Sequence, residues 1–496
     1  MSAATLTAFV IYLVGMLAIG FVCYALTKNL SDYILGGRGL GPGVAALSAG
    51  ASDMSGWLLL GLPGAMYAAG MNQIWIAVGL TIGAYLNWQF VARRLRVYTE
   101  VAADSITIPD YLDNRFRDSS KALRVLSALV ILVFFTFYVS SGLVGGAVLF
   151  EQTFGLSYGV ALWVGALVII SYTFLGGFLA VSWTDFVQGI LMFLALVIVP
   201  VVAISELGGW EATVARAGAI DPTYNSVLTD MTLLGIVSLM GWGLGYFGQP
   251  HILARFMAVR SAADIPTARF IGMTWMVLSL YGAIFTGYAG IAYFADAPLE
   301  NAETVFMTFT QILFNPWVSG FLLAAILAAI MSTIDSQLLV SSSAVTEDFY
   351  KAFLRKDAGD AELVWVGRAS VIGVALIALL LAGDPESRIL DLVSYAWAGF
   401  GAAFGPVIIL SLFWRRTTRN GALAGLIVGA ATVIVWAQIE GGLFDMYELV
   451  PGFILGALAV VAASLAGPEP SPEILAEFDR VRAEEPERVT AGPARA

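Results

Sequence analysis

An aspartate in the middle of a long apolar stretch carries the strongest chemical signal in this sequence of 496 residues. Asp53 lies among serines, alanines and glycines. If the stretch crosses a membrane, an unpaired charge there costs several kcal/mol, so the carboxylate needs a partner cation or a proton. We expect coupling to a cation. The alternative is a protonated aspartate that caps a broken helix.

A second polar cluster lies in a later apolar stretch. Ser332, Asp335 and Ser336 have the i, i+3, i+4 spacing of one helix face. Thr333 is offset from Ser332 by about 100°, one step of a helix with 3.6 residues per turn. Such hydroxyls, with carbonyls freed by an unwound helix, suit Na⁺; a polar face bonded to a neighbouring helix is the alternative. Two interpretations of Asp185 stay open: a position at the membrane surface, or a role in ion binding.

The backbone that must position these groups carries two signals of broken helices. Residues 46–57 gather small and hydroxyl side chains around Asp53, and residues 240–250 contain four glycines and a proline. Each glycine costs about 1 kcal/mol against alanine inside a helix, and proline about 3 kcal/mol. Unwinding is therefore expected, although small residues are also typical of close helix packing. Two interrupted helices five spans apart predict an inverted repeat with a site between them.

Composition indicates an all-α polytopic membrane protein. The chain is 59% hydrophobic and 12% charged, and it contains many apolar runs near the length of about 20 residues that crosses a bilayer. We predict thirteen transmembrane helices, at 5–26, 42–70, 71–92, 124–150, 157–178, 183–205, 230–250, 268–294, 306–343, 364–383, 389–413, 420–440 and 449–467, the two longest with bends or surface turns. The expected divisions are a first helix and loop (1–41), a transport core of spans 2–6 and 7–11 (42–413), peripheral spans 12 and 13 (414–467), and a tail (468–496).

The basic residues give an orientation. Of the 25 Lys and Arg residues, only Arg216 and Arg388 fall in the loops on one side; the others, including Arg94 and Arg255, are assigned to the opposite loops and the tail. The positive-inside bias therefore predicts an external N-terminus and a cytoplasmic C-terminus. The first apolar stretch has no basic residue before it, so we do not expect a cleaved signal. The tail is expected to be a solvated helix with a frayed end.

Several kinds of chemistry are disfavoured. One histidine and one cysteine exclude most His/Cys metal sites and make a Ser-His-Asp arrangement improbable. No lysine follows a glycine, so there is no Walker A loop. We expect no enzyme, no nucleic-acid partner and no obligate protein partner, only membrane lipid around a gradient-driven transporter. A passive channel and a transporter-like sensor are the alternatives; a sensor is disfavoured because we expect residues 468–496 to form only a short tail and no signalling domain.

Four longer stretches resemble the sodium:solute symporter family, in particular its bacterial members that carry sodium with proline. They are residues 33–38, 47–57, 238–257 and 394–406, and the match is collinear from about residue 5 to 465. The resemblance implies a leucine-transporter-type five-plus-five inverted repeat with extra peripheral helices. It also implies sodium-coupled uptake of L-proline across the bacterial cytoplasmic membrane by alternating access. Pantothenate, sialic acid or another amino acid is the alternative solute.

The same resemblance implies the roles of individual residues. It implies a Na⁺ site made by the carbonyls of Ala51, Met54 and Ala329 and the hydroxyls of Ser332 and Thr333. It assigns sodium/proline coupling to Asp53, Ser55 and Arg38, and proline binding to Trp57, Tyr138, Trp242, Tyr246 and Pro250.

Proline chemistry agrees with these roles. Aromatic faces attract a cation and pack on an apolar ring, while a half-helix N-terminus can hold a carboxylate.

One position departs from the pattern. Where this chain has Asp335, family members that carry proline are expected to have a hydroxyl residue. The position resembles one that contributes to a second sodium site in some sialic-acid relatives, opposite the match for Asp185. We therefore hypothesise a second cation or proton site made by Asp185, Asp335 and Ser336.

Overall fold

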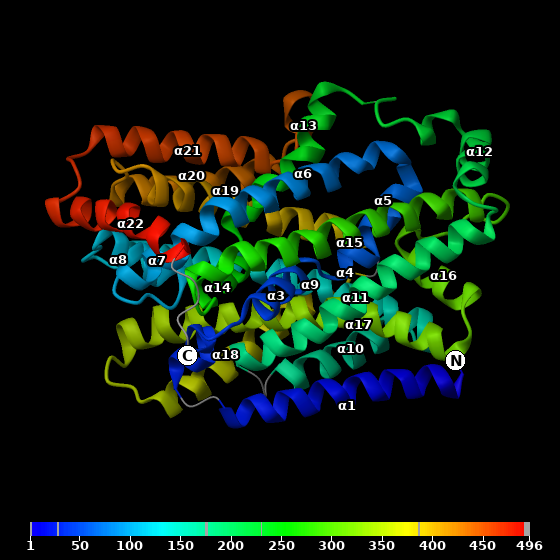
Figure 1. The fold of residues 1–496 in the computed structure, drawn as a ribbon, viewed down its shortest axis with the longest axis horizontal. Helices are drawn as coiled ribbons and strands as arrows, with labels where there is room; N and C mark the ends of the chain where they lie inside the picture. Colours follow the sequence, from blue (N-terminus) through cyan, green and yellow to red (C-terminus); the bar gives the residue numbers. More distant parts are fainter. Residues whose placement is uncertain (1, 27–28, 174–176, 230, 385–386, 491–496) are drawn as a thin grey trace.

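The fold is a bundle of long helices that run along the longest axis of the molecule (Figure 1). The computed structural model describes residues 2–26, 29–173, 177–229, 231–384 and 387–490, and all regular elements in these ranges are helical. Ten helices are long and apolar enough to cross a membrane, and three shorter apolar helices cover 56–69, 158–170 and 233–248. The all-α architecture is confirmed, whereas the count of thirteen spans stays a prediction that depends on the shorter helices.

Most predicted spans correspond to one helix. The long helices before the seventh span are α1 (Ala3–Leu26), α6 (Ile74–Leu86) continued by α7 (Ala92–Val101), α9 (Ala122–Phe154), α10 (Tyr158–Thr173) and α11 (Phe178–Glu206). Those after it are α15 (Ile265–Tyr293), α17 (Pro316–Ser343), α18 (Asp360–Leu381), α19 (Ile389–Phe413), α20 (Arg419–Trp436) and α21 (Leu449–Ala466). Shorter helices are α2 (Leu30–Leu35), α8 (Ile108–Phe116), α12 (Trp210–Ile220), α16 (Val305–Leu313) and α22 (Pro472–Thr490).

The second span is broken where the sequence predicts it. It consists of α3 (Pro42–Asp53), α4 (Gly56–Leu59) and α5 (Gly61–Ala69). Met54 and Ser55 leave the helical conformation between α3 and α4. The Ser55 hydroxyl then accepts a hydrogen bond from the Trp57 N–H and so caps the new helix. The break therefore lies beside Asp53, at the buried centre of the bundle.

The seventh span is broken as well. Its parts are α13 (Leu233–Gly241), the 3₁₀ segment η5 (Trp242–Gly248) and α14 (Pro250–Ala258), with Gln249 in an extended conformation before Pro250. The glycines here allow close approach: a Cβ atom on Gly243 would clash with the carbonyl of Gly79 on α6. Likewise, a Cβ on Gly83 would clash with the carbonyl of Gly243. The unwound segment thus lies directly against the backbone of the third span.

This close approach gives a first testable prediction. Gly83→Ala should destabilise the protein by about 1–3 kcal/mol, the usual cost of overpacking, because the rigid η5 backbone blocks the added methyl group. The measurement is the thermal unfolding temperature of the purified protein in detergent. Gly15→Ala is the matched control, because a Cβ on Gly15 of α1 meets no atom within 4 Å. Equal unfolding temperatures for the two variants would contradict the argument.

Some boundaries differ from the prediction. The third span continues past residue 92 as α7 to Val101, so Arg94 lies in a helix and is buried rather than in a loop. The region 306–343 is interrupted at Phe314 and Asn315, between α16 and α17, which confirms the expected bend. The last residues of the predicted span 157–178 and the first of 230–250 lie partly outside the described residues.

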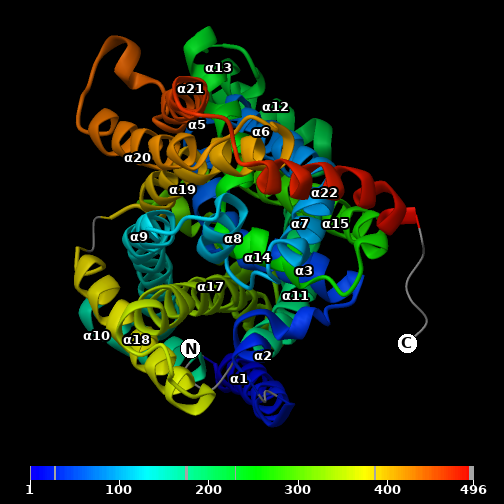
Figure 2. The same cartoon turned by 90° about the vertical axis from the view of Figure 1, so that its left-hand side faces the viewer.

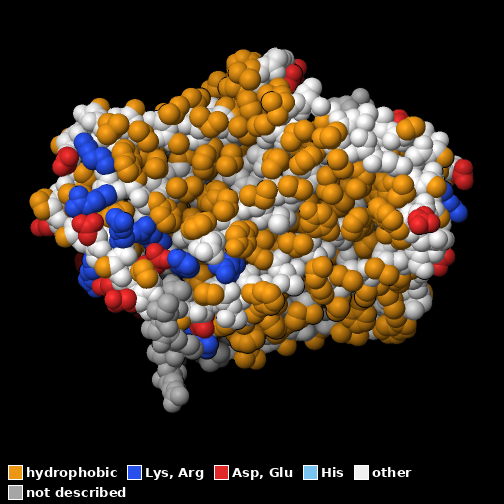
Figure 3. Space-filling view, turned by 45° about the horizontal axis from the view of Figure 1, so that its top comes forward, with side chains coloured by type: hydrophobic (Ala, Val, Ile, Leu, Met, Phe, Trp, Pro, Cys, Tyr) orange, Lys and Arg blue, Asp and Glu red, His pale blue; other side chains and the backbone are white. Residues whose placement is uncertain are grey.

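One end of the long axis is held together by the tail. Figure 2 looks onto this end, where α22 packs on α7 and on the short segment η6 (Ala262–Asp264). Phe478 and Val481 are buried, so the expectation of a solvated helix is wrong on this face; residues 491–496 lie outside the described residues. Most Lys and Arg side chains visible in Figure 3 gather at this end, and the middle of that surface is largely hydrophobic.

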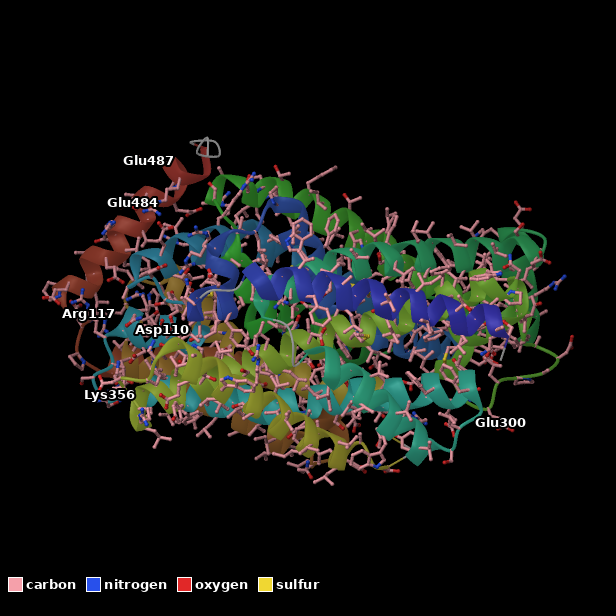
Figure 4. All side chains as sticks on the ribbon, turned by 90° about the horizontal axis from the view of Figure 1, so that it is seen from below. Asp110, Arg117, Glu300, Lys356, Glu484 and Glu487 are labelled. Atoms are coloured by element: carbon pink, nitrogen blue, oxygen red, sulfur yellow. The ribbon has the colours of Figure 1, made fainter. Side chains whose placement is uncertain are left out.

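Figure 4 shows Arg117, Lys356 and Glu484 at this α22 end and Glu300 at the opposite end.

Candidate functional site

The break in the second span meets hydroxyl groups of α17. Ser332 donates hydrogen bonds to the carbonyl oxygens of Ala51, at 2.8 Å, and Ala329, at 3.1 Å. Thr333 donates to the same Ala51 oxygen at 3.3 Å. Met54 directly follows the last turn of α3, where a helix end leaves carbonyl groups without intrahelical partners. The structure therefore joins four of the five predicted sodium ligands and places the fifth at the adjoining break.

The donor atoms at this position fit an alkali cation. They are hydroxyl and carbonyl oxygens, which hard cations prefer, and they are buried and uncharged. Among the residues that the structure describes, no group of three or more His, Cys, Asp or Glu side chains is arranged to hold a metal ion. The oxygen atoms that meet at this break carry no charge of their own.

Asp53 lies on another face of the same break and joins it to the seventh span. The hydroxyl of Tyr246, on η5, donates to Asp53 Oδ2 at 2.5 Å. The Tyr138 hydroxyl, on α9, donates to the Asp53 backbone carbonyl at 3.1 Å. The side chain is 2% exposed, and within the described parts of the chain it forms no ion pair with Lys, Arg or His. The Asp53 carboxyl group is thus held by a hydrogen bond and has no cationic partner among the described residues.

Aromatic rings from several spans surround the two breaks. The rings of Trp57 and Trp242 lie 6.2 Å apart between centroids, and Trp242 stacks on Tyr447 at 5.3 Å. Tyr246 meets the edge of Trp397 at 5.1 Å. All four predicted aromatic residues for the solute are buried here, and so is Pro250, the first residue of α14.

Aromatic faces of this kind attract a positive charge and pack against apolar groups.

Arg38 lies apart from this centre, at the α22 end. Its guanidinium donates to the carbonyl of Met257 at 2.9 Å and to Asp104 at 2.9 Å. Two residues later, Leu40 and Val259 form a backbone bridge. The Leu40 N–H donates to the Ala258 carbonyl at 3.1 Å. The two broken spans are therefore joined by backbone bonds at this end, and Arg38 reinforces the junction.

A cavity of about 410 Å³ lies farther along the second span, beside α5. Gly61 and Gly64 of α5 line it, with Glu303, Arg388 and Asp391. Glu303 accepts hydrogen bonds from the first N–H groups of α19, each at 3.3 Å. Burial raises the pKa of the Glu303 carboxyl, and these two bonds lower it only in part. The polar space thus lies on the side away from the Leu40 junction.

Comparison with known proteins assigns the family. The family model described as "Sodium:solute symporter family" matches residues 33–429, which is most of the chain. The chain belongs to the sodium:solute symporter family. Two similar relatives of this family are the Sodium/proline symporter of Escherichia coli (strain K12), 58% identical with 96% of each chain covered, and the High-affinity proline transporter PutP of Bacillus subtilis (strain 168), 56% identical with 94% of this chain and 98% of the relative covered.

Solved structures show the fold of the family. A Na⁺-coupled sialic acid symporter in a substrate-bound outward-open state matches with a TM-score of 0.80 at 18% identity, over 95% of this chain and 99% of the other. Mhp1, a nucleobase-cation-symport-1 family transporter, matches with a TM-score of 0.54 at 14% identity, over 92% and 99% of the two chains. The leucine-transporter-type fold expected from the resemblance is thereby confirmed.

Asp185 lies inside this symporter fold rather than at its surface. Its Oδ2 accepts hydrogen bonds from Ser48, at 2.6 Å, and from Arg255, at 3.2 Å. The same guanidinium donates to Ser336 at 2.5 Å, and Asp335 is fully buried on the same helix. The structure therefore brings Asp185 and Ser336 together around a fixed cation. Arg255, which the charge pattern assigns to a loop, is fully buried in α14; that assignment is wrong.

Sequence reasoning also missed residues that support the symporter site. Trp397 of α19 donates its indole N–H to the Trp242 carbonyl at 2.8 Å and so holds the unwound segment. It lies within the family-like stretch 394–406, which was the available signal. For Arg255 the available signal was weaker. It lies four residues after His251, within a helix that begins at Pro250. Its partner Asp185 is 70 residues away, so local spacing does not reveal the pair.

Proposed function

We propose that this chain is a secondary active transporter, not an enzyme, that couples the entry of Na⁺ to the uptake of L-proline by alternating access. It lies in the bacterial cytoplasmic membrane, with the N-terminus outside and α22 in the cytoplasm. It acts on sodium and proline while surrounded by membrane lipid, without nucleic acid and without an obligate protein partner.

The observation that carries this proposal is the meeting of α17 hydroxyls with carbonyls at the break in the second span. Ser332 and Thr333 both bond to the Ala51 carbonyl, which is the donor set that a weakly held Na⁺ requires. Relatives named for sodium and proline are more than half identical to nearly the whole chain, which supports the choice of solute. The buried aromatic rings beside Asp53 suit the ring and ammonium of proline.

The proposed mechanism follows from which elements each ligand joins. Na⁺ enters from the side of the 410 Å³ cavity and links α3 to α17 through Ala51 and Ser332. This fixes the break that also carries Asp53, Ser55 and Trp57, and so organises the proline pocket against η5. Whatever sodium adds to proline affinity, proline adds to sodium affinity, because binding coupling is reciprocal. Separation of Leu40 from Ala258 then opens the path to the cytoplasm.

Uptake into proteoliposomes tests the function. Purified protein with an inward Na⁺ gradient should accumulate labelled proline above its external concentration, and unlabelled proline should compete better than other amino acids, pantothenate or sialic acid. Replacement of Na⁺ by choline should abolish accumulation. Equal accumulation in choline would refute sodium coupling. Uptake that stops at equal concentrations on both sides, with unitary conductance, would indicate a channel.

The second cation site remains part of the proposal. The region contains the carboxylates of Asp185 and Asp335 and the guanidinium of Arg255, all fully buried, so one additional positive charge would balance it. We expect Asp335→Ser to lower the number of charges moved per proline, while proline binding persists. The measurement is the ratio of electrical charge to labelled proline in reconstituted vesicles. An unchanged ratio together with unchanged sodium dependence would show that Asp335 adds no such site.

A further inference from the structure

The third span changes its helical geometry at Asn87, which contacts the broken seventh span. Residues Asn87–Val91 form a π-helical turn, η3, between α6 and α7. Single π turns inside α-helices are frequent at functional sites. Asn87 is the first residue of this turn, and its side chain is 1% exposed. An amide in such a place requires hydrogen-bond partners.

The Asn87 amide is held in one orientation. Its Nδ2 donates to the backbone carbonyl of Tyr246 at 2.9 Å. A carbonyl oxygen only accepts hydrogen bonds, so the NH₂ group must face Tyr246 and the side-chain oxygen is left for another ligand. Tyr246 in turn donates its hydroxyl to Asp53 at 2.5 Å. A chain of hydrogen bonds therefore runs from Asn87 through Tyr246 to Asp53 and joins three spans.

Asn87 and Asp53 also face one small cavity. The cavity measures about 20 Å³ and is lined by both side chains, by Tyr246 and by Met276. A single water needs about 10–15 Å³ by this measure, so the space admits one molecule of that size. Asn87 Oδ1 and Asp53 Oδ1 are buried and accept no hydrogen bond from any residue that the structure describes. The occupant must therefore donate hydrogen bonds or carry a positive charge.

We propose that Asn87 is a positioning residue for Asp53, and that one water molecule in the cavity donates to the free oxygens of both side chains in the sodium-free protein. The inference rests on the proposed sodium-coupled function. Water offers two donors to two acceptors, so it hydrates the carboxylate although no protein cation is present. Asn87 thereby holds Asp53 from two sides, through Tyr246 and through the water.

Sodium binding without proline tests the positioning role. Asn87→Ala should weaken binding of ²²Na⁺ to the purified protein by about tenfold, as expected for a lost hydrogen bond to a charged network. In a Tyr246→Phe background only the water-mediated link to Asp53 remains, so the same change should weaken binding by a clearly smaller factor, about threefold or less. Equal factors in both backgrounds would indicate packing alone and would overturn the proposal.

Control experiments distinguish a failure of the role proposed for Asn87 from a failure of the proposed sodium-coupled function. Thr286→Val removes a buried polar group at a different place, a hydroxyl that bonds within α15 at 2.8 Å, and should leave sodium binding unchanged. If Asn87→Ala does not fold, Asn87→Ser is used in the same cycle, since serine is too short to reach the Tyr246 carbonyl. Wild-type protein that binds no sodium would refute the proposed function itself. Wild-type binding with a normal Asn87→Ala affinity would refute only the role of Asn87.

The water molecule proposed for the cavity is tested directly by an experimental density map of the wild-type protein in sodium-free buffer. One water between Asn87 and Asp53 is expected, and an empty cavity would contradict the assignment.

Discussion

Asp53→Asn should raise the sodium concentration for half-maximal proline uptake by about 100-fold, which corresponds to about 3 kcal/mol of lost cation affinity. Asp53 is buried at the break, bonded to Tyr246, and has no protein cation within the described residues. Asparagine keeps the shape and one acceptor oxygen but removes the charge that attracts Na⁺. The measurement is the initial rate of labelled proline uptake in proteoliposomes over a series of Na⁺ concentrations.

The control for this change is Asp360→Asn. Asp360 is exposed at the start of α18, so loss of its charge should leave the half-saturating sodium concentration within about twofold, since exposed charges contribute little. Unfolding temperatures should be similar for both variants and the wild type. An Asp53→Asn protein that folds normally and keeps the wild-type sodium dependence would remove Asp53 from cation coupling.

Arg255→Met should produce the largest loss of stability. The substitution leaves Asp185 as a charge in the protein interior, and breaking a buried ion pair in this way costs about 3–5 kcal/mol. Ser48 and Ser336 would lose their bonds to the guanidinium at the same time. We expect little folded protein in the membrane, measured by size-exclusion chromatography in detergent and by thermal unfolding.

Two further variants define what Arg255 contributes. The double variant Arg255→Met with Asp185→Leu removes both charges and should recover much of the lost stability, because an apolar pair of similar volume often replaces a buried ion pair without loss. Arg415→Met breaks a half-exposed pair with Asp479 and should cost about 1 kcal/mol or less. If Arg255→Met is as stable as Arg415→Met, the buried pair is not a structural element.

The broken helices could be predicted because their causes are local. Glycines, a proline and an isolated aspartate each disfavour a continuous apolar helix, and the structure breaks at Met54 and Gln249. The shared face of Ser332 and Ser336 is equally local, since it follows from helical periodicity. The contact between Ser332 and Ala51 could not be predicted in this way, because residue spacing does not indicate which helices are neighbours. Only the family resemblance supplied it.

Contacts between distant segments account for what was missed. Arg255 was assigned to a loop because its partner Asp185 lies in another helix, far away in sequence. Asn87 gave no signal either, since neither a π turn nor its bond to Tyr246 is visible in residue types. The packed face of α22, in contrast, could have been predicted from local spacing.

For α22 the signal was present. Ile474, Phe478 and Val481 have the spacing of one helix face, which predicts packing of the tail against another surface.

In the proposed mechanism, the junction at Leu40 must separate before the path to the cytoplasm opens. Two backbone hydrogen bonds, from Leu40 to Ala258 and from Arg260 back to Leu40, link the ends of the two broken spans, and the Arg38 guanidinium adds a bond to the Met257 carbonyl. Each backbone hydrogen bond contributes about 1 kcal/mol net, so thermal motion can break these bonds on the microsecond-to-millisecond scale. On the proposed mechanism, these backbone bonds are weak enough to break and re-form in each transport cycle without ATP.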